Sequence, residues 1–250
     1  MANSSKIEWT DATWNPATGC SKISEGCQNC YADEVAQHLQ RMGQEKYKNG
    51  FIYTEHVNAL DIPLHWKKPK KIFVNSMSDL FHENATDGFI NQVFLTMIKA
   101  PWHTYQILTK RPERMKEFIL KWLQDNDLTK VPAWIWIGVT CESKLRTGRI
   151  DILKSIPAHV RFVSFEPLLN EVEPNLQDIQ WIIVGGESGN NHRPISQEWV
   201  RTLLAKAREF NTAFFFKQWG GRTPKSGGRE LDGQTYSEFP QLQVNRQVDE

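Results

Sequence analysis

Short apolar runs alternate with amphipathic segments along most of the chain. The runs lie at residues 71–74, 104–108, 134–139, 161–163, 181–184 and 213–216. Most are continuously apolar, which is typical of strands buried on both faces, as in a parallel sheet. Segments with apolar residues at helical spacing lie between most of the runs, at residues 89–100, 113–123 and 198–210. This alternation predicts βα units and an α/β fold.

Each apolar run ends in polar or small residues. In chain order these ends are Asn75-Ser76-Met77-Ser78-Asp79, Thr109-Lys110-Arg111, Thr140-Cys141-Glu142-Ser143, Ser164-Phe165-Glu166-Pro167, Gly185-Gly186-Glu187-Ser188 and Lys217-Gln218-Trp219-Gly220. In (β/α) barrels the carboxyl ends of the strands and their loops build the active site. We therefore expect a partial or irregular (β/α) barrel of about six to seven parallel strands with one shared site.

The chain shows no internal repeat and no clear linker. Its 250 residues suit a single barrel domain over residues 1–250. From Gly221 onward the sequence is rich in Gly and Arg and then polar, so residues 221–250 are expected to form an irregular C-terminal flap over one end of the barrel.

Charge and hydropathy exclude several classes of protein. Thirty Lys and Arg residues against 29 Asp and Glu residues give a net charge of +1, which does not favour nonspecific coating of DNA. The basic run at residues 66–71 is either a phosphate-binding patch or a solvated loop. No apolar run approaches the roughly 18–20 residues of a membrane helix. No signal peptide is visible at the start, so a cytoplasmic protein without membrane association is expected.

Three of the four cysteines are clustered. Cys20, Cys27 and Cys30 have the spacing C-x6-C-x2-C, whereas Cys141 is remote. A disulfide framework is typical of short secreted chains, so clustered thiols here indicate metal or iron–sulfur ligands. A helix is expected from Tyr31, with Tyr31, Val35, Leu39 and Met42 on one stripe. Cys30 would then lie at a helix N-terminus, which favours an anionic cluster.

The number of thiols bears on the identity of the metal. A structural zinc ion needs four protein ligands, and the fourth would be Asp33, His38 or Cys141. A [4Fe–4S] cluster held by three thiolates leaves one iron open to bind a small molecule. We favour the cluster, with zinc and the absence of any metal as the alternatives.

The cysteine segment resembles a known cluster loop. It is similar to the cluster loop of radical S-adenosylmethionine (radical SAM) enzymes. The residues that carry this similarity are Asn15-Pro16, Gly19-Cys20 and Cys27-Gln28-Asn29-Cys30-Tyr31-Ala32. The similarity is greatest to the branch around spore photoproduct lyase, in which Cys-Tyr-Ala also follows the last cysteine. The resemblance implies a full or partial (β/α) barrel, a [4Fe–4S] cluster on three cysteines, and SAM on the fourth iron. The common spacing of those enzymes is C-x3-C-x2-C, so the first gap is longer here.

A second resemblance covers nearly the whole chain. The matching segments lie at residues 7–16, 73–82, 108–112, 184–189 and 215–220. They resemble the phage-associated three-Cys-motif family, which is regarded as divergent and radical-SAM-like. Members often carry an aliphatic residue in place of Cys141, which implies that this cysteine is accessory.

The resemblance to radical SAM barrels implies that residues at the strand ends bind the cofactor or take part in catalysis. Residues expected to bind the cofactor are Asn75, Ser76, Ser78, Asp79, Lys110, Gly185, Gly186 and Glu187. Residues expected to be catalytic are Glu142, Glu166, Glu187 and Lys217, since carboxylates can bind a substrate amine or relay protons. The alternatives are turns that merely end the strands, and ordinary salt bridges.

The main functional hypothesis is a radical SAM-type enzyme. A nucleic acid or nucleotide substrate follows from the resemblance, and an electron donor such as a flavodoxin-type reductant is required. The first alternative is a non-enzymatic Fe–S or zinc protein that binds nucleic acid or a protein partner. The second is a cluster-bearing enzyme that binds a nucleotide without SAM.

Overall fold

Seven parallel strands form one curled sheet, a half-barrel. The computed structural model describes residues 5–241. Along the sheet the strands are β1 (Ala12–Trp14), β4 (Lys71–Val74), β5 (Thr104–Thr109), β6 (Ile135–Thr140), β7 (Arg161–Phe165), β8 (Trp181–Gly185) and β9 (Ala213–Gln218). Every neighbouring pair is parallel. The predicted α/β fold with a partial barrel of parallel strands is therefore confirmed.

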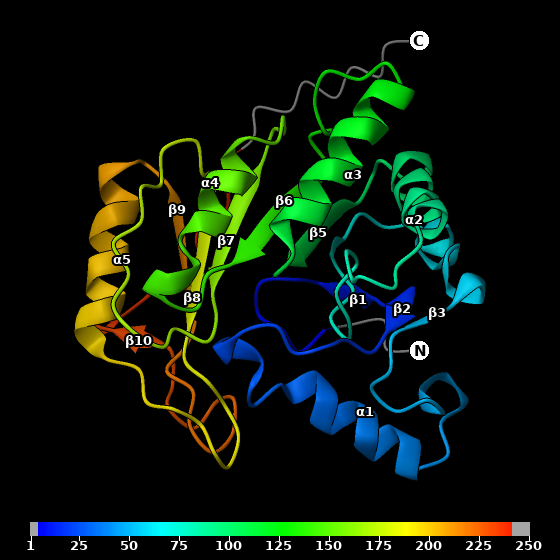
Figure 1. The fold of residues 1–250 in the computed structure, drawn as a ribbon. Helices are drawn as coiled ribbons and strands as arrows, with labels where there is room; N and C mark the ends of the chain where they lie inside the picture. The colour runs from blue at the N-terminus through cyan, green and yellow to red at the C-terminus, as the bar shows by residue number, and fades with distance from the viewer. Residues whose placement is uncertain (1–4, 242–250) are drawn as a thin grey trace.

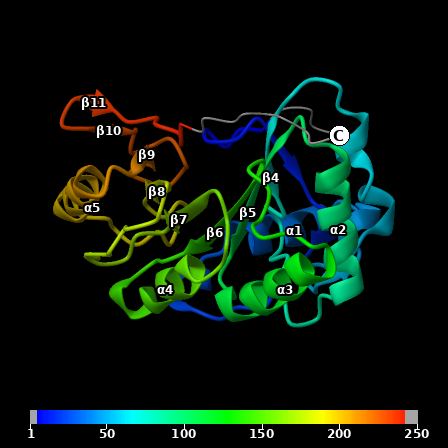
Figure 2. The ribbon, with the colours of Figure 1, turned by 90° about the horizontal axis from the view of Figure 1, so that it is seen from above.

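Helices cover the outer, convex face of this sheet (Figures 1 and 2). They are α2 (Asp87–Lys99), α3 (Pro112–Asp125), α4 (Gly148–Lys154) and α5 (Gln197–Glu209). The three helices expected from apolar periodicity are present, whereas α4 and β1 were not predicted. With seven and three residues, α4 and β1 are too short to show a period.

Short elements complete the chain. The 3-10 helices are η1 (Glu25–Cys27), η2 (Glu45–Tyr47), η3 (Val57–Ala59), η4 (Ile62–His65) and η5 (Lys144–Arg146). The paired short strands are β2 (Ala17–Thr18) with β3 (Thr54–Glu55), and β10 (Glu230–Leu231) with β11 (Gln234–Thr235). No helix in the described part of the chain is long and apolar enough to cross a membrane.

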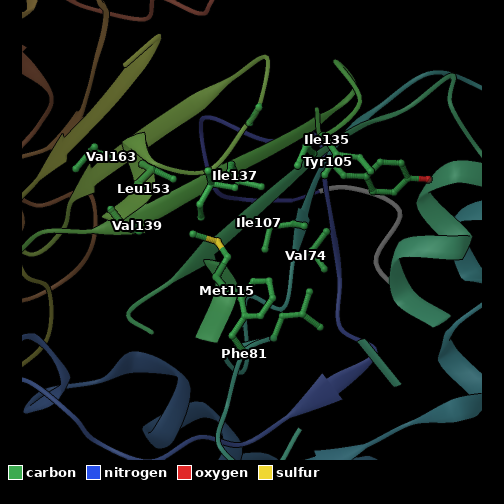
Figure 3. Close-up of a cluster of buried hydrophobic side chains, with 14 of the residues drawn as sticks. Val74, Phe81, Tyr105, Ile107, Met115, Ile135, Ile137, Val139, Leu153 and Val163 are labelled. Carbon is green, nitrogen blue, oxygen red and sulfur yellow. The ribbon is translucent and has the colours of Figure 1, made fainter. Parts of the chain in front are cut away.

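The two faces of the sheet are packed differently. Toward the outer helices, aliphatic side chains such as Ile107, Ile137 and Val163 meet Met115 of α3 and Leu153 of α4 (Figure 3). Toward the inner face, the alternate strand positions carry mainly aromatic side chains. This second core contains Trp9, Phe73, Trp136, Phe162, Trp181 and Phe215. Side chains alternate between the faces of a strand, so one strand sequence supplies both cores.

The segment after β9 lies against the inner face. The ring centroid of Phe239 is 5.1 Å from that of Trp181 and 5.7 Å from that of Phe215. Ser237 forms an antiparallel bridge with Phe215 of β9. The expected flap over residues 221–250 includes residues 242–250, which lie outside the described residues.

Helix α1 (Tyr31–Arg41) begins where it was predicted but buries a different face. Ala32 and Ala36 pack against Met77 in a small separate cluster. The stripe expected from spacing is largely exposed, since Tyr31 and Val35 are 53% and 40% accessible. In Figure 1, α1 lies at the lower edge of the molecule, away from the four outer helices. Met77, against which α1 packs, follows β4 in the chain. Helix α1 therefore covers the carboxyl edge of the sheet, whereas the four outer helices cover its convex face.

Candidate functional site

The cysteine loop is fastened to the segment that follows β4. The amide of Gly19 donates to the carbonyl of Met77 at 2.9 Å, and that of Cys20 donates to the carbonyl of Phe51 at 3.0 Å. Gly19 has φ of 81°, and a Cβ there would lie 2.2 Å from the carbonyl oxygen of Ile52. Only glycine fits such a close approach of two backbones. These contacts place the first cysteine at the carboxyl edge of the sheet.

The clustered cysteines and the remote cysteine lie in different surroundings. Cys20, Cys27 and Cys30 are partly exposed and free of disulfides, whereas Cys141 is buried in the outer core. Cys27 ends η1, and Cys30 is the N-cap of α1. Accessible thiols in one loop can take up a cofactor from solution, but a thiol enclosed in the core cannot.

An ion pair beneath the loop holds Cys20. Arg111 donates from Nη1 to Asp79 Oδ2 at 3.1 Å and to Cys20 Sγ at 3.6 Å, and from Nη2 to Ser21 Oγ at 2.7 Å. Asp79 Oδ1 in turn accepts from Thr109 Oγ1 at 2.7 Å. Burial raises the pKa of the Cys20 thiol to about 11, with a further rise from the charge of Asp79 that Arg111 opposes. Asp79 and Arg111 thus connect the ends of β4 and β5 to the first cysteine.

The charge of Lys110 lowers the pKa of the second clustered cysteine, Cys27. Burial disfavours the thiolate of Cys27, but the charge of Lys110 and hydrogen bonds from Ile23 and Ser24 outweigh it and lower the thiol pKa. Among the described residues no hydrogen bond or ion pair occupies the Lys110 ammonium, although its amide donates to Asp79 Oδ2 at 3.1 Å. Two cations from one strand end therefore face the cysteine loop.

A second anchor ties the loop to the end of β8. Glu187 Oε2 accepts from Asn29 Nδ2 and from Arg193 Nε, each at 2.9 Å. Arg193 Nη1 also donates to the carbonyl of Glu25 at 3.0 Å. Both oxygens of Glu187 are occupied, since Oε1 pairs with Arg193 Nη2 at 2.5 Å. In this arrangement Glu187 positions the loop, and its catalytic role stays a prediction.

Three of the residues expected to bind the cofactor contact the turn between β1 and β2. Ser76 Oγ donates to Asn15 Oδ1 at 3.1 Å, and Ser78 Oγ donates to the carbonyl of Ala17 at 3.2 Å. Asn75 has φ of 60°, and its Oδ1 accepts from the Ala17 amide at 3.3 Å. Its Nδ2 is buried and has no partner among the described residues. A donor in that state is available to a ligand.

The two remaining carboxylates of the predicted group are paired with cations. Glu142 is fully buried, and its Oε2 accepts from Arg149 Nη1 at 2.8 Å. Its Oε1 has no partner among the described residues, and a Cβ on Gly26 would lie 3.0 Å from it. Glu166 Oε1 lies 2.9 Å from Lys217 Nζ. The unpartnered oxygen of Glu142 therefore faces the cysteine loop.

The two glycines at the carboxyl end of β8, Gly185 and Gly186, allow close packing. A Cβ on Gly185 would lie 2.8 Å from Glu166 Oε1, and a Cβ on Gly186 would lie 2.0 Å from the carbonyl oxygen of Trp219. Gly185 thus makes room for the ion pair of Glu166 with Lys217. Gly186 lets the end of β8 approach the end of β9.

Sequence reasoning missed the partners of these residues. Arg149 and Arg193 were not singled out, yet each neutralises a glutamate of the site. The His82 ring contacts Ser21 Oγ at 3.0 Å and stacks on the ring of Tyr53, with the centroids 4.6 Å apart. Nothing in the spacing of these residues distinguishes them from surface residues.

The donor set can be tested against the two metal alternatives. No three His, Cys, Asp or Glu side chains of residues 5–241 converge as one metal ion requires. A zinc ion would need four such ligands around one point. In an iron–sulfur cluster each thiolate binds its own iron, so the sulfurs must surround the cluster but need not meet at a single ion. Three free thiols in one loop beside Lys110 and Arg111 fit a thiolate-ligated, anionic cluster.

The chain matches the model of one protein family. The match covers residues 4–240, and the matching family is described as a protein of unknown function, DUF5131. The chain belongs to the DUF5131 family. Comparison with curated proteins and with solved structures gives no match. Membership in DUF5131 assigns no activity, so the function must be argued from the site itself.

Proposed function

We propose that this member of DUF5131 is an iron–sulfur enzyme of the radical SAM type. Cys20, Cys27 and Cys30 hold a [4Fe–4S] cluster, and SAM is the ligand of the open iron. The supporting observation is the set of three accessible thiols on one loop across the carboxyl edge of a parallel half-barrel. That edge is where barrels of this kind build their active sites.

The protein's own residues perform three tasks at this site. When bound, the cluster supplies one electron for reductive cleavage of SAM, which gives a radical that abstracts hydrogen from the substrate. Arg111 and Lys110 offset the negative charge of the thiolates. Glu187 and Arg193 fix the loop, and the aromatic inner core keeps water out of the other end of the half-barrel.

Unsatisfied polar groups support a ligand site beside the loop. Among residues 5–241, Asn75 Nδ2 and Glu142 Oε1 are buried without a hydrogen-bond partner, and no hydrogen bond or ion pair involves the Lys110 ammonium. They come from the ends of three neighbouring strands, β4, β5 and β6. In this proposal Lys110 pairs with the carboxylate of SAM, and Asn75 binds one of its polar groups. The other residues predicted to bind the cofactor lie at the ends of β4 and β8 and are Ser76, Ser78, Asp79, Gly185, Gly186 and Glu187.

The proposed catalytic groups lie around the same edge. Glu142 is the best-placed proton acceptor, because its Oε1 has no hydrogen-bond partner within residues 5–241. Glu166 and Lys217 form an ion pair on the inner face, and either group can take up or release a proton. A nucleic acid or nucleotide substrate and a flavodoxin-type electron donor are part of the proposal. The basic run at residues 66–71 leads into β4, whose first residue is Lys71, which places it at the opposite, amino edge of the sheet.

The test is electron paramagnetic resonance of anaerobically reconstituted protein. We expect a [4Fe–4S]⁺ signal that changes when SAM is added, and cleavage of SAM under reducing conditions. Cys20→Ala, Cys27→Ala and Cys30→Ala should each lose the SAM-responsive signal and the cleavage. Cys141→Ala is the matched control and should keep both, because Cys141 lies in the outer core.

Two outcomes would contradict the proposal. A cluster signal that ignores SAM would favour a structural Fe–S protein or an enzyme that binds a different ligand. Zinc in place of iron, retained after anaerobic reconstitution, would favour the non-enzymatic alternative.

A further inference from the structure

A pocket with three cationic side chains borders the inner face of the sheet at β9. Its volume is about 230 Å³. Lys217 comes from β9, Lys225 and Arg229 come from the segment after it, and Glu8 comes from the N-terminal segment. Three cations stand against Glu8 and against Glu166, which pairs with Lys217, so the balance of charge stays positive by one. No role assigned above uses Lys225, Arg229 or Glu8.

Arg229 is held in place but keeps a donor free. Its guanidinium carbon lies 5.1 Å from the ring centroid of Phe215 on the inner face. Nη2 donates to Ser237 Oγ at 2.6 Å and to the carbonyl of Tyr236 at 3.3 Å. Nε is buried and has no partner among the described residues. Such a fixed guanidinium loses little conformational freedom when it binds an anion.

The two lysines add further donors. Lys217 Nζ lies 2.9 Å from Glu166 Oε1, and an ammonium has three N–H groups, so two remain. For the Lys225 ammonium no hydrogen bond or ion pair is found in the described part of the chain, and the residue is exposed. A guanidinium and two ammonium groups around one space form the donor set that phosphate prefers.

We propose that this pocket binds a phosphate group of the substrate. The inference rests on the proposed function and narrows its substrate to a phosphate-bearing molecule. The volume is below the range of about 300–1,000 Å³ that encloses a whole small ligand, so the pocket holds one part of a larger one. Lys217 connects it to Glu166 at the carboxyl end of β7. The phosphate therefore fixes the substrate at the same carboxyl edge of the sheet across which the cysteine loop lies.

The first test is calorimetric titration of the full chain at low ionic strength. The probes are a nucleoside monophosphate, the same nucleoside without phosphate, and inorganic phosphate. We expect the monophosphate to bind, inorganic phosphate to bind more weakly, and the nucleoside not to bind. Equal binding of nucleoside and monophosphate would overturn the inference. A short single-stranded oligonucleotide in parallel tells whether the phosphate comes from a small molecule or from a nucleic acid.

Charge variants of the pocket sharpen the test. Arg229→Gln and Lys225→Ala should each weaken binding of the monophosphate about tenfold, as expected for loss of a charged hydrogen bond. Arg222→Ala removes one charge from the same segment outside the pocket, and should change the affinity by less than about twofold. Glu8→Gln should tighten binding about threefold because it removes a like charge, and misfolding cannot produce that gain. Equal losses in Arg222→Ala and Arg229→Gln would reduce the effect to net charge and contradict the inference.

Failure of this inference and failure of the proposed function have different signatures. The pocket is built without the cysteine loop, so the Cys20→Ala variant should bind the monophosphate like the unmodified chain. A SAM-responsive cluster without phosphate binding would overturn only the pocket. Phosphate binding without any SAM response would overturn only the radical SAM assignment.

Discussion

The two ends of the inner face of the sheet differ in chemistry although the same strands build both. Toward the amino ends, Trp136 and Trp181 belong to an almost entirely apolar core. Toward the carboxyl ends, the same side of β6, β7 and β8 continues into Glu142, Glu166 and Glu187. Every second residue of a strand points to the same face, so the change from aromatic to acidic occurs within a few residues.

This difference separates stability from chemistry. The aromatic end is held mainly by contacts among its rings, and the indole N–H of Trp181 donates to the backbone carbonyl of Glu238 at 2.9 Å, so its tryptophans need no charged partner. Each glutamate at the other end needs a cation supplied from elsewhere: Arg149 from α4, Lys217 from β9, and Arg193 from the loop after β8. A buried carboxylate without such a partner would cost several kcal/mol, of the order expected for an unpaired buried ion. Burial of charge at the acidic end therefore lowers the free energy of unfolding unless each carboxylate is paired, and such an arrangement is typical of a functional site.

Removing the central ring of the aromatic end should have the largest effect on stability. Trp181 is fully buried, and its ring contacts those of Trp9, Trp136, Phe162, Phe215 and Phe239. We expect Trp181→Ala to lower the free energy of unfolding by about 3–5 kcal/mol, as for other large aromatic truncations. Urea denaturation measures the loss, and a change below about 1 kcal/mol would show that this end does not carry stability.

The fold was largely predictable because burial leaves a direct record in the sequence. Strands buried on both faces, such as β6 and β8, read as continuous apolar runs. The packing of α1 was not predictable in the same way. Its spacing indicates a buried stripe through Tyr31 and Val35, yet the small Ala32 and Ala36 are the buried residues. The reason is that α1 covers the carboxyl edge of the sheet rather than one of its faces.

Breaking the most deeply buried ion pair at the acidic end should have the next largest effect. Glu142 and Arg149 have side-chain accessibilities of 0% and 9%, and Arg149→Met leaves the carboxylate without its cation. We expect a loss of about 3 kcal/mol in the free energy of unfolding, because an unpaired buried charge is strongly destabilising. The double variant Glu142→Gln with Arg149→Met removes both charges and should recover much of that loss. Equal stability of the single and double variants would contradict the pairing.

The candidate site was predictable only in part. Polar strand ends and clustered cysteines mark where chemistry can occur, because both are local patterns. The cations that pair with those strand ends lie on other elements, at distances set only by the folded chain. Arg193 is six residues from Glu187 and contacts both it and the cysteine loop, but an arginine in a polar loop looks the same without that contact.

The smallest of these effects depends on pH and concerns the anchor of the cysteine loop. Burial raises the pKa of Glu187, but hydrogen bonds from Arg193 and Asn29 outweigh it, and the pKa lies below its usual value of 4.5. The stabilisation is therefore fully present above about pH 4.5, the unfolded-state value, and is lost as the pH falls through the folded-state pKa. Arg193→Gln should cost about 2 kcal/mol at pH 7, in the range of hydrogen bonds to charged groups.

That cost should shrink in acid, because protonated Glu187 no longer attracts the guanidinium. The measurement is urea unfolding of both proteins at pH 7 and near pH 3. Arg201→Gln is the control, since Arg201 and Asp232 form an exposed pair with 47% and 46% accessible side chains and should show no comparable change. A cost for Arg193→Gln that stays constant with pH would mean that Arg193 holds the loop through the Glu25 carbonyl alone, and that the charge of Glu187 is not part of the anchor.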